Sequence, residues 1–324
     1  MPVHMRLLVI CAAALLLLDG CTPKQQQEQK KRIAGIVFGE DQFFRLVLFG
    51  MRDAARTNGV ELLEANSAQK PDREIQLVNT YIASNVDAIV ISPLSTVSSV
   101  SALARARDKK IAVVTFNTTI VEDFPASFIE SDQVDLGAST GKAARAYIEQ
   151  HLGGKAQVAI LAFMSQAKEV SAQRTDGFTQ EITKLPGVKI VAQQDAWMPE
   201  QGVKKVNDIL TANPGVNLIW AANEGGTTGA VMAVKNSGKA GKIVVFGTDT
   251  DEQLANFLLA DDNILQAVTG QQPFEIGRLA VEAAVKTLKG EPVDKKRSLP
   301  GILLTREKPA EISAFKERLL NLTK

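Results

Sequence analysis

The chain has 324 residues, more than one hydrophobic core usually organises, so its length favours two domains. Hydrophobic residues make up 45% and charged residues 23%, a balance typical of globular proteins that excludes a disordered or collagen-like chain. Lysine and arginine number 37 against 36 aspartates and glutamates, so the chain lacks the positive potential that nucleic acid or an anionic membrane surface requires, and a neutral ligand fits better.

The first predicted element is an export signal. Residues 7–18 form an apolar run that is too short to span a bilayer comfortably, and a glycine then precedes Cys21, as in a bacterial lipobox. An uncleaved anchor and ordinary signal cleavage are the alternatives, and all three interpretations mean export. We predict a signal peptide over 1–20, a lipid on Cys21 that anchors the protein on the extracytoplasmic side of the membrane, and a flexible polar tether over 21–32.

Cysteine and histidine are scarce in the rest of the chain. With Cys11 in the removed segment and Cys21 acylated, the folded body has no thiol for a disulfide or a cysteine metal site. His151 is its sole histidine, and it lies at the end of a predicted helix. We therefore expect neither a metal nor another cofactor.

From residue 33 onward, β-branched runs alternate with segments of helical period, which is typical of βαβ units and parallel sheets. The first series of predicted strands covers 33–38, 60–65, 87–92 and 111–116. A helix over 134–151 opens a second series, with strands at 157–163, 189–194, 216–222 and 243–248. The helix after the first strand should bury Phe44 and end at Asn58-Gly59. The pattern predicts an α/β fold with two doubly wound lobes, in which ligands bind beyond the carboxyl ends of the strands.

Residues that follow the predicted strands are the candidates for ligand binding. Asp41, Phe43 and Phe44 follow the first strand. Phe44 fits the buried helix face, whereas Phe43 lies about 100° away and would offer an aromatic surface to the C–H face of a sugar. Helix capping by Asp41 and core packing by the phenylalanines are the alternatives.

Short polar side chains follow three later strands, namely those of Asn117, Asn223 and Asp249. Amides and a carboxylate suit vicinal hydroxyl groups, each of which both donates and accepts hydrogen bonds. Helix N-capping explains any one of these residues alone, but their recurrence at strand ends favours a binding site. Trp197 precedes a proline in a predicted loop, where tryptophan often marks a binding surface.

The sequence carries no recognisable signal for an enzyme. Residues 137–142 (GASTGK) are one residue short of a phosphate loop and fall inside a helix, so close packing of small residues explains them better. The glycines at 225–229 open a helix without a dinucleotide fingerprint, and they would permit close backbone approach. With one body histidine and no G-x-S-x-G motif, no hydrolase site can be assembled. We expect a binding protein and not an enzyme.

These residues resemble the periplasmic sugar-binding proteins of the ribose-binding type, the ligand receptors of ABC importers. The landmarks are D-Q-F-F at 41–44, V-D-A-I-V-I-S-P at 86–93, R-T-D-G-F at 174–178, A-A-N-E at 221–224, G-T-D at 247–249 and Q-Q-P-F-E-I-G at 271–277. The resemblance implies ligand contacts from the candidates named above and places Gln271 at a three-strand hinge. It also implies discontinuous lobes with a ligand cleft between them, 33–131 with 272–302 and 132–271 with 303–324.

Two departures from the ribose-type pattern concern the substrate. Asn117-Thr118 stand where that pattern has an Asp-Arg pair, so two charged hydrogen-bonding partners are lost. One alignment puts Ala172 at the family's second-lobe arginine, and another puts Arg174 there. Because buried polar groups reject ligands that leave them unpaired, the ligand need not be ribose.

The resemblance implies a monomeric binding component that captures a monosaccharide or polyol by hinge closure and delivers it to an ABC permease. A sensory receptor that signals to a membrane kinase or chemoreceptor would use the same cleft. Transcriptional repression would need an N-terminal helix-turn-helix, where this chain has an export signal.

Overall fold

The computed structural model describes residues 30–322. The predicted signal peptide, Cys21 and most of the predicted tether lie outside these residues. The first strand, β1 (Arg32–Val37), begins one residue earlier than the sequence predicts. Within 30–322, no helix combines the length and the apolar character that a membrane crossing requires.

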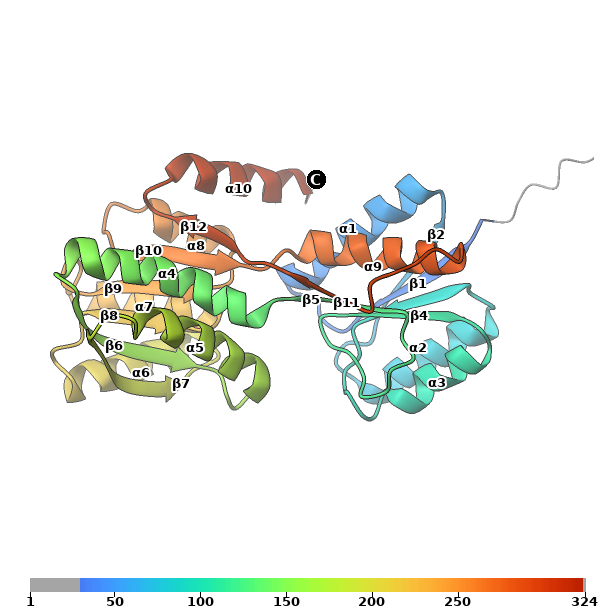
Figure 1. The fold of residues 1–324 in the computed structure, drawn as a ribbon, viewed down its shortest axis with the longest axis horizontal. Helices are drawn as coiled ribbons and strands as arrows, with labels where there is room; N and C mark the ends of the chain where they lie inside the picture. The colour runs from blue at the N-terminus through green and yellow to red at the C-terminus, as the bar shows by residue number, and fades with distance from the viewer. Residues whose placement is uncertain (1–29, 323–324) are drawn as a thin grey trace, which may run out of the picture. The chain divides into compact units, whose positions relative to one another are not determined.

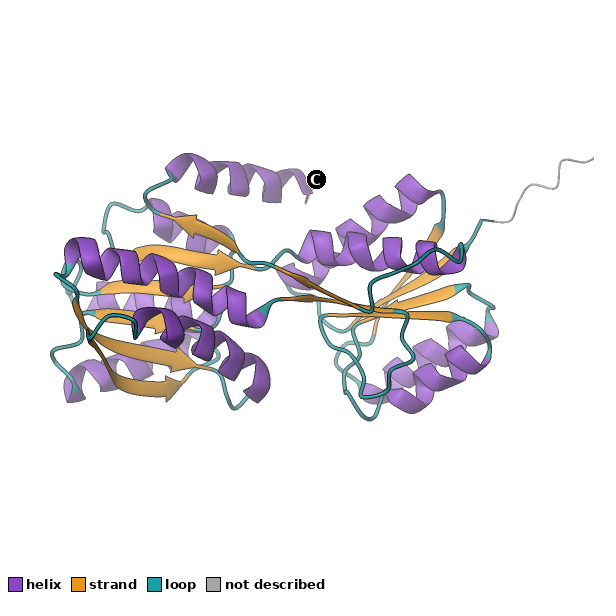
Figure 2. Ribbon diagram, in the orientation of Figure 1, coloured by secondary structure: helices purple, strands orange, loops and turns teal. Residues whose placement is uncertain are grey.

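The first lobe is built on a parallel sheet (Figures 1 and 2). Among the described residues its strands are β1, β2 (Glu61–Asn66), β3 (Ala88–Ile91), β4 (Ala112–Phe116), β5 (Ser127–Ser131) and β11 (Lys296–Leu299). They lie in the order β11-β5-β4-β3-β1-β2, and every adjacent pair is parallel. One face is covered by α1 (Gln42–Asn58) and α9 (Pro273–Leu288), and the other by α2 (Pro71–Ala83) and α3 (Val100–Asp108).

The second lobe repeats this arrangement. Its described strands are β6 (Lys155–Ala162), β7 (Gly187–Asp195), β8 (Leu218–Ala221), β9 (Val244–Thr248), β10 (Leu265–Gly270) and β12 (Ile302–Thr305). Their order is β12-β10-β9-β8-β6-β7, and all adjacent pairs are parallel except β10 and β12. Helices α4 (Gln133–His151) and α5 (Lys168–Ile182) cover one face. The other face packs against α6 (Pro199–Ala212), α7 (Glu224–Asn236), α8 (Glu252–Leu259) and α10 (Pro309–Leu322).

The predicted fold class is confirmed, and each predicted strand has a counterpart in the structure. The predicted end of the first helix is also confirmed, because Gly59 caps α1 with a left-handed φ of 67°. Strands β5, β10, β11 and β12 were not among the predicted strands. Two of these are four-residue strands, β11 (KRSL) and β12 (ILLT), whose pairing partners lie far away in sequence, so local periodicity carries little signal for them.

The chain passes between the two sheets at three points. It leaves the first sheet after β5 to form β6, returns from β10 to β11, and leaves again from β11 to β12. Both sheets share one strand order, in which the topology reverses between the first and third strands of each lobe. In doubly wound sheets, ligands bind beyond the carboxyl ends of the strands next to this reversal.

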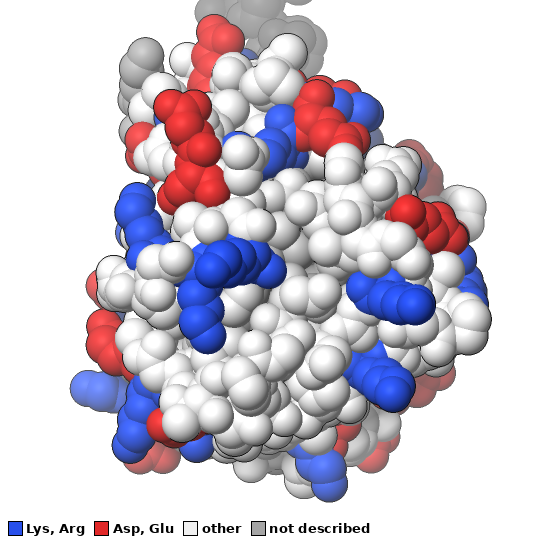
Figure 3. Space-filling view, turned by 90° about the vertical axis from the view of Figure 1, so that its left-hand side faces the viewer, with Lys and Arg blue, Asp and Glu red and all other residues white. Residues whose placement is uncertain are grey.

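Charges of both signs are mixed on the face of the protein in Figure 3, with uncharged residues between them. The full chain carries a formal net charge of +1. The mixture on this face agrees with the near-neutral composition.

The helices α4 and α5 pack backbone to backbone through glycine. A Cβ atom on Gly137 would lie 1.8 Å from the carbonyl oxygen of Arg174, and one on Gly177 would lie 2.1 Å from that of Val134. Gly137 belongs to the GASTGK segment, which lies inside α4, so its interpretation as close-packed small residues is confirmed. The contact fixes α4 against the helix that carries Arg174.

Replacing Gly137 by alanine should lower the free energy of unfolding. The substitution improves helix propensity by roughly 0.5–1 kcal/mol, but the clash is with a backbone atom that cannot rotate away. Overpacking of this kind costs about 1–3 kcal/mol. Urea denaturation measures the change, with Glu149→Ala on the exposed face of the same helix as the control. A Gly137→Ala variant that is as stable as the parent protein would show that α4 can move away from α5 at little cost.

Candidate functional site

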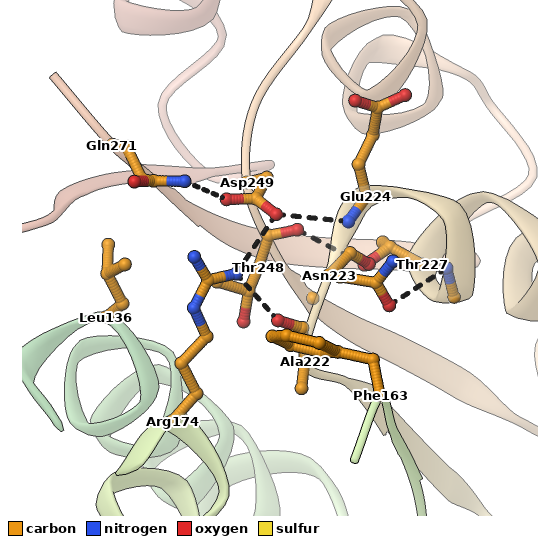
Figure 4. Close-up of polar contacts among 12 residues, drawn as sticks. Leu136, Phe163, Arg174, Ala222, Asn223, Glu224, Thr227, Thr248, Asp249 and Gln271 are labelled. Atoms are coloured by element: carbon orange, nitrogen blue, oxygen red, sulfur yellow. Dashed lines mark hydrogen bonds and ion pairs between the residues drawn. The ribbon is translucent and has the colours of Figure 1, made fainter. Parts of the chain in front are cut away.

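Asp249 lies at the centre of a polar cluster at the carboxyl end of β9 (Figure 4). Its φ of 71° is left-handed, a conformation that aspartate adopts more readily than most residues, and its N–H donates to Thr269 O at 2.8 Å. Its Oδ2 accepts hydrogen bonds from Arg174 Nη1 (3.1 Å) and from the backbone N–H of Glu224 (3.2 Å). Its Oδ1 accepts one from Gln271 Nε2 at 2.9 Å. The carboxylate is therefore held on both oxygens.

Arg174 provides the positive partner of this carboxylate from helix α5. The residue is only 4% exposed, and its guanidinium lies over the ring of Phe163, 5.4 Å from the centroid. Its Nε donates to Gln133 Oε1 at 2.8 Å, and Nη1 also donates to Ala222 O at 2.9 Å. Nη2 makes no hydrogen bond to any of residues 30–322. The two N–H groups of Nη2 are thus the donors that this arginine can offer to a ligand.

Asn223 and Trp197 form a second group beside the first. Asn223 caps α7, because its Oδ1 accepts from Gly226 N at 3.3 Å, while its Nδ2 donates to Trp197 O at 2.8 Å. Gln201 Oε1 accepts from Trp197 N at 2.9 Å. Trp197 is 42% exposed, and its ring centroid lies 5.4 Å from that of Phe163. The loop backbone is therefore fixed on both sides of an exposed indole.

In the first lobe, the candidates lie at the ends of β1 and β4. Asp41 caps α1 by accepting from Phe44 N at 3.2 Å. Phe44 is 5% exposed, so its predicted burial is confirmed. Phe43 is half-buried, and its ring packs edge-on against that of Phe44 with 5.2 Å between the ring centroids. Asn117 has a φ of 60°, and its Nδ2 donates to Ser92 Oγ at 3.3 Å. Asn117 and Asp249 thus share a left-handed conformation at equivalent positions of the two sheets.

Some of the candidate residues are hydrogen-bonded to one another, whereas others only lie in the same lobe. Hydrogen bonds connect Asp249 with Arg174 and Gln271, and Gln271 Oε1 accepts a further one from Ser131 Oγ at 2.9 Å. Capping, the alternative interpretation of Asp41 and Asn223, is what their side chains are seen to do. Between the two alignments for the second-lobe arginine, it is Arg174 that reaches the strand ends, whereas Ala172 is a half-buried alanine of α5.

Sequence reasoning missed three residues of this cluster. Phe163 and Ser92 directly follow β6 and β3, but the predicted strands ran one residue too far and included them, so the search of residues after the strands passed them over. Gln133 gives no such signal, because its contact with Arg174 depends on how α4 crosses α5.

Three acidic side chains of the second lobe also lie close together. Glu224 is accessible to solvent, yet partial burial of its carboxyl, followed by the charges of Asp251 and Asp249, raises its pKa from 4.5 to about 7. Burial is also the main reason that the pKa of Asp251 is raised. Within residues 30–322, no three such side chains are arranged to hold a metal ion.

The raised pKa of Glu224 predicts a pH-dependent cost to stability. The folded protein holds a proton on this carboxyl up to about pH 7, and the unfolded chain loses it near pH 4.5. The free energy of unfolding should therefore fall as pH rises through this window. Glu224→Gln mimics the protonated side chain, so its stability relative to the parent protein should increase from pH 4.5 to 7 and then level off.

Urea denaturation at several pH values tests this dependence. Glu252→Gln, at the exposed start of α8, controls for the loss of one negative charge. A stability difference between Glu224→Gln and the parent protein that does not change between pH 4.5 and 8 would contradict the raised pKa.

A surface hollow of about 760 Å³ lies at the start of α2, where Lys70, Arg73 and Leu77 contribute to its lining. Its lining includes none of the candidate residues. Side chains of a single helix and the loop before it form it, whereas the strand-end cluster combines polar and aromatic groups from several elements. The strand ends are therefore the better candidate site.

Two similar α/β lobes, three connections between them, and polar and aromatic side chains at the strand ends define the class of two-lobed receptors for small solutes. The periplasmic binding protein domain matches residues 35–292, and the chain belongs to this family, in its ribose-binding type. The family consists of extracytoplasmic binding components of transporters and not of enzymes.

Curated relatives cover most of the chain. The ABC transporter periplasmic-binding protein YphF of Escherichia coli K12 is 29% identical over 267 residues, which are 80% of this chain and 81% of that protein. The D-allose-binding periplasmic protein of the same organism is 30% identical over 261 residues, covering 76% of this chain and 81% of its own.

Solved structures agree with this assignment. A periplasmic solute-binding protein from Actinobacillus succinogenes 130z with bound D-allose superposes with a TM-score of 0.77 at 25% identity, over 87% of this chain and 100% of that one. The arabinose-transporter binding protein of Shewanella sp. ANA-3, bound to L-arabinofuranose, gives a TM-score of 0.76 at 25% identity, over 90% of this chain and 98% of its own.

Proposed function

We propose that this protein is the solute-binding component of an ABC importer, which captures a monosaccharide or polyol by hinge closure and delivers it to the permease. The relatives described as ABC transporter and D-allose-binding proteins support this function. They favour transport over the sensory role that the cleft alone would allow.

The observation that carries the proposal is the pair of Asp249 with Arg174, whose guanidinium lies over the Phe163 ring. Asp249 accepts hydrogen bonds, and Nη2 of Arg174 donates them, so the pair can bind two neighbouring hydroxyl groups of one ligand. The exposed ring of Trp197 lies beside Phe163 and suits the apolar C–H face of a sugar. A polyhydroxylated ring presents both kinds of surface together.

The first lobe adds neutral groups to this site. Asn117 and Thr118 offer an amide and a hydroxyl where the ribose-type pattern has two charged side chains. Selection among sugars would then depend on which hydroxyl groups leave these neutral partners unpaired. We propose that the ligand is contacted by Asp41, Phe43, Asn117, Arg174, Trp197, Asp249 and Gln271. Phe44 is buried and packs against the ring of Phe43. Asn223 is also buried and donates a hydrogen bond to the backbone carbonyl of Trp197.

Titration calorimetry and thermal shift against pentoses, hexoses, polyols and nucleosides test the function. One or a few sugars or polyols should bind and raise the melting temperature, because a ligand that binds only the folded protein stabilises it. If no sugar or polyol binds, the proposed ligand class is wrong. If only a nucleoside bound, the site would belong to a nucleoside-binding protein and the proposed sugar or polyol ligand would be wrong.

The proposed function requires that the protein be exported, and a lipid anchor would hold it at the membrane. We infer a signal peptide over 1–20, a lipid on Cys21, a tether over 21–32 and a monomeric body with lobes 33–131 plus 272–302 and 132–271 plus 303–324. The strand memberships of the two sheets support these lobes, although Ile302 already belongs to β12 of the second sheet and Arg32, the last residue of the predicted tether, already belongs to β1. A Cys21→Ser variant should move from the membrane fraction to the soluble fraction, and an unchanged distribution would argue against the lipid.

A further inference from the structure

Gln133 holds the ligand-facing arginine without itself being one of the proposed ligand contacts. It is the first residue of α4, directly after Asp132, which caps the helix by accepting from Asp135 N at 2.9 Å. Its Oε1 accepts the Nε–H of Arg174 at 2.8 Å. Gln133 is therefore placed where the chain enters the second lobe, two residues beyond the end of β5.

The contact between Gln133 and Arg174 is built into the packing of two helices. Without a Cβ atom on Gly137 or Gly177, the backbones of α4 and α5 approach each other closely. This approach brings residues 41 positions apart in sequence within hydrogen-bond distance. The position of Gln133 relative to Arg174 is thus set by backbone contacts and not by a flexible surface loop.

A guanidinium group is planar, so fixing two of its nitrogen atoms fixes the third. Gln133 Oε1 holds Nε, while Ala222 O and Asp249 Oδ2 hold Nη1. The direction of Nη2, the nitrogen without an acceptor among the described residues, follows from these three bonds. Without the acceptor on Gln133, a nearly buried Nε–H would lack a partner, and the group would turn to find another one.

A second glutamine holds the other member of the ion pair in the same way. Gln271 Nε2 donates to Asp249 Oδ1 at 2.9 Å, and Gln271 Oε1 accepts from Ser131 Oγ at 2.9 Å. Gln271 follows β10, where the chain returns to the first lobe. Two uncharged amides, each at a connection between the lobes, therefore hold the arginine and the aspartate of the ion pair.

We propose that Gln133 is a positioning residue for ligand binding, which directs Nη2 of Arg174 toward the ligand and ties this arginine to the first connection between the lobes. The inference rests on the proposed function, because it concerns the same site.

The test compares Gln133→Leu and Gln133→Glu with the parent protein. Leucine removes the acceptor at similar size and should weaken binding of the identified sugar about tenfold, the equivalent of about 1.4 kcal/mol. Glutamate keeps an acceptor for Nε and should stay within about threefold of the parent protein. Gln150→Leu, on the exposed last turn of the same helix, is the matched control.

Two further measurements separate positioning from a general structural effect. In an Arg174→Met background, Gln133→Leu should have no additional effect on affinity, because it acts through Arg174. In the ligand-free protein, ¹⁵N NMR should show a slowly exchanging Arg174 Nε–H signal that is protected in the parent protein and in Gln133→Glu but exchanges rapidly in Gln133→Leu.

The outcomes distinguish this inference from the proposed function. Failure of every sugar to bind the parent protein would refute the function alone, and the NMR comparison would still decide the role of Gln133. Unchanged protection of the Arg174 Nε–H in Gln133→Leu would overturn the positioning role, as would equal affinity for the bound sugar. Equal loss of affinity in Gln133→Leu and Gln133→Glu would also overturn it, because the acceptor would then not matter.

Discussion

Asp249→Ala should weaken sugar binding about 100- to 1,000-fold, because truncating one partner of a buried, hydrogen-bonded charge pair costs about 3–4 kcal/mol. Three effects add to this loss. The ligand loses its acceptor, Arg174 is left nearly buried without its carboxylate, and alanine must adopt a φ of 71°. The variant should also unfold at a lower urea concentration even without ligand, since the pair exists in the free protein.

Asp249→Asn separates these effects. Asparagine tolerates the left-handed conformation and keeps one oxygen acceptor, but it loses the charge. We expect about tenfold weaker binding, the equivalent of about 1.4 kcal/mol, and a smaller loss of stability than in Asp249→Ala. Calorimetry and urea denaturation measure the two quantities. Unchanged affinity in Asp249→Ala would place the ligand away from the end of β9.

Trp197→Ala should weaken binding roughly 30-fold, or about 2 kcal/mol, the loss that a central aromatic contact typically carries. The indole is 42% exposed in the free protein, and the backbone around it is held by Asn223 and Gln201. Because the residue is exposed, the substitution should change the free energy of unfolding only slightly. A ring held in advance by a rigid loop loses little entropy when the ligand arrives.

Trp197→Phe and Trp197→Leu are the controls for this position. Phenylalanine retains an aromatic face and should recover most of the affinity, whereas leucine is apolar but offers no ring and should bind little better than alanine. Calorimetry with the sugar that the parent protein binds gives the ranking. If leucine matched phenylalanine, apolar contact alone would explain the contribution of Trp197 and ring stacking would not.

Much of the scaffold could be predicted from the sequence, because its signals are local. Runs of β-branched residues marked the strands that carry Asn117, Asn223 and Asp249. The glycine after Asn58 marked the end of α1, where only a residue tolerant of positive φ fits well. Strands β11 and β12 gave no comparable signal, because they are short and are stabilised by pairing with strands far away in the chain.

In the candidate site, too, local features could be predicted from the sequence and long-range contacts could not. That Asp41, Asn117, Trp197, Asn223 and Asp249 follow strands could be inferred from the sequence, since this placement depends only on strand periodicity. The pairing of Arg174 with Asp249, the hydrogen bond from Asn223 to the Trp197 backbone and the hydrogen bond between Arg174 and Gln133 became visible only in the folded chain. These contacts join residues that are 26 to 75 positions apart in the sequence. They depend on helix crossings and loop positions, which follow from packing of the whole lobe and leave no local pattern in the sequence.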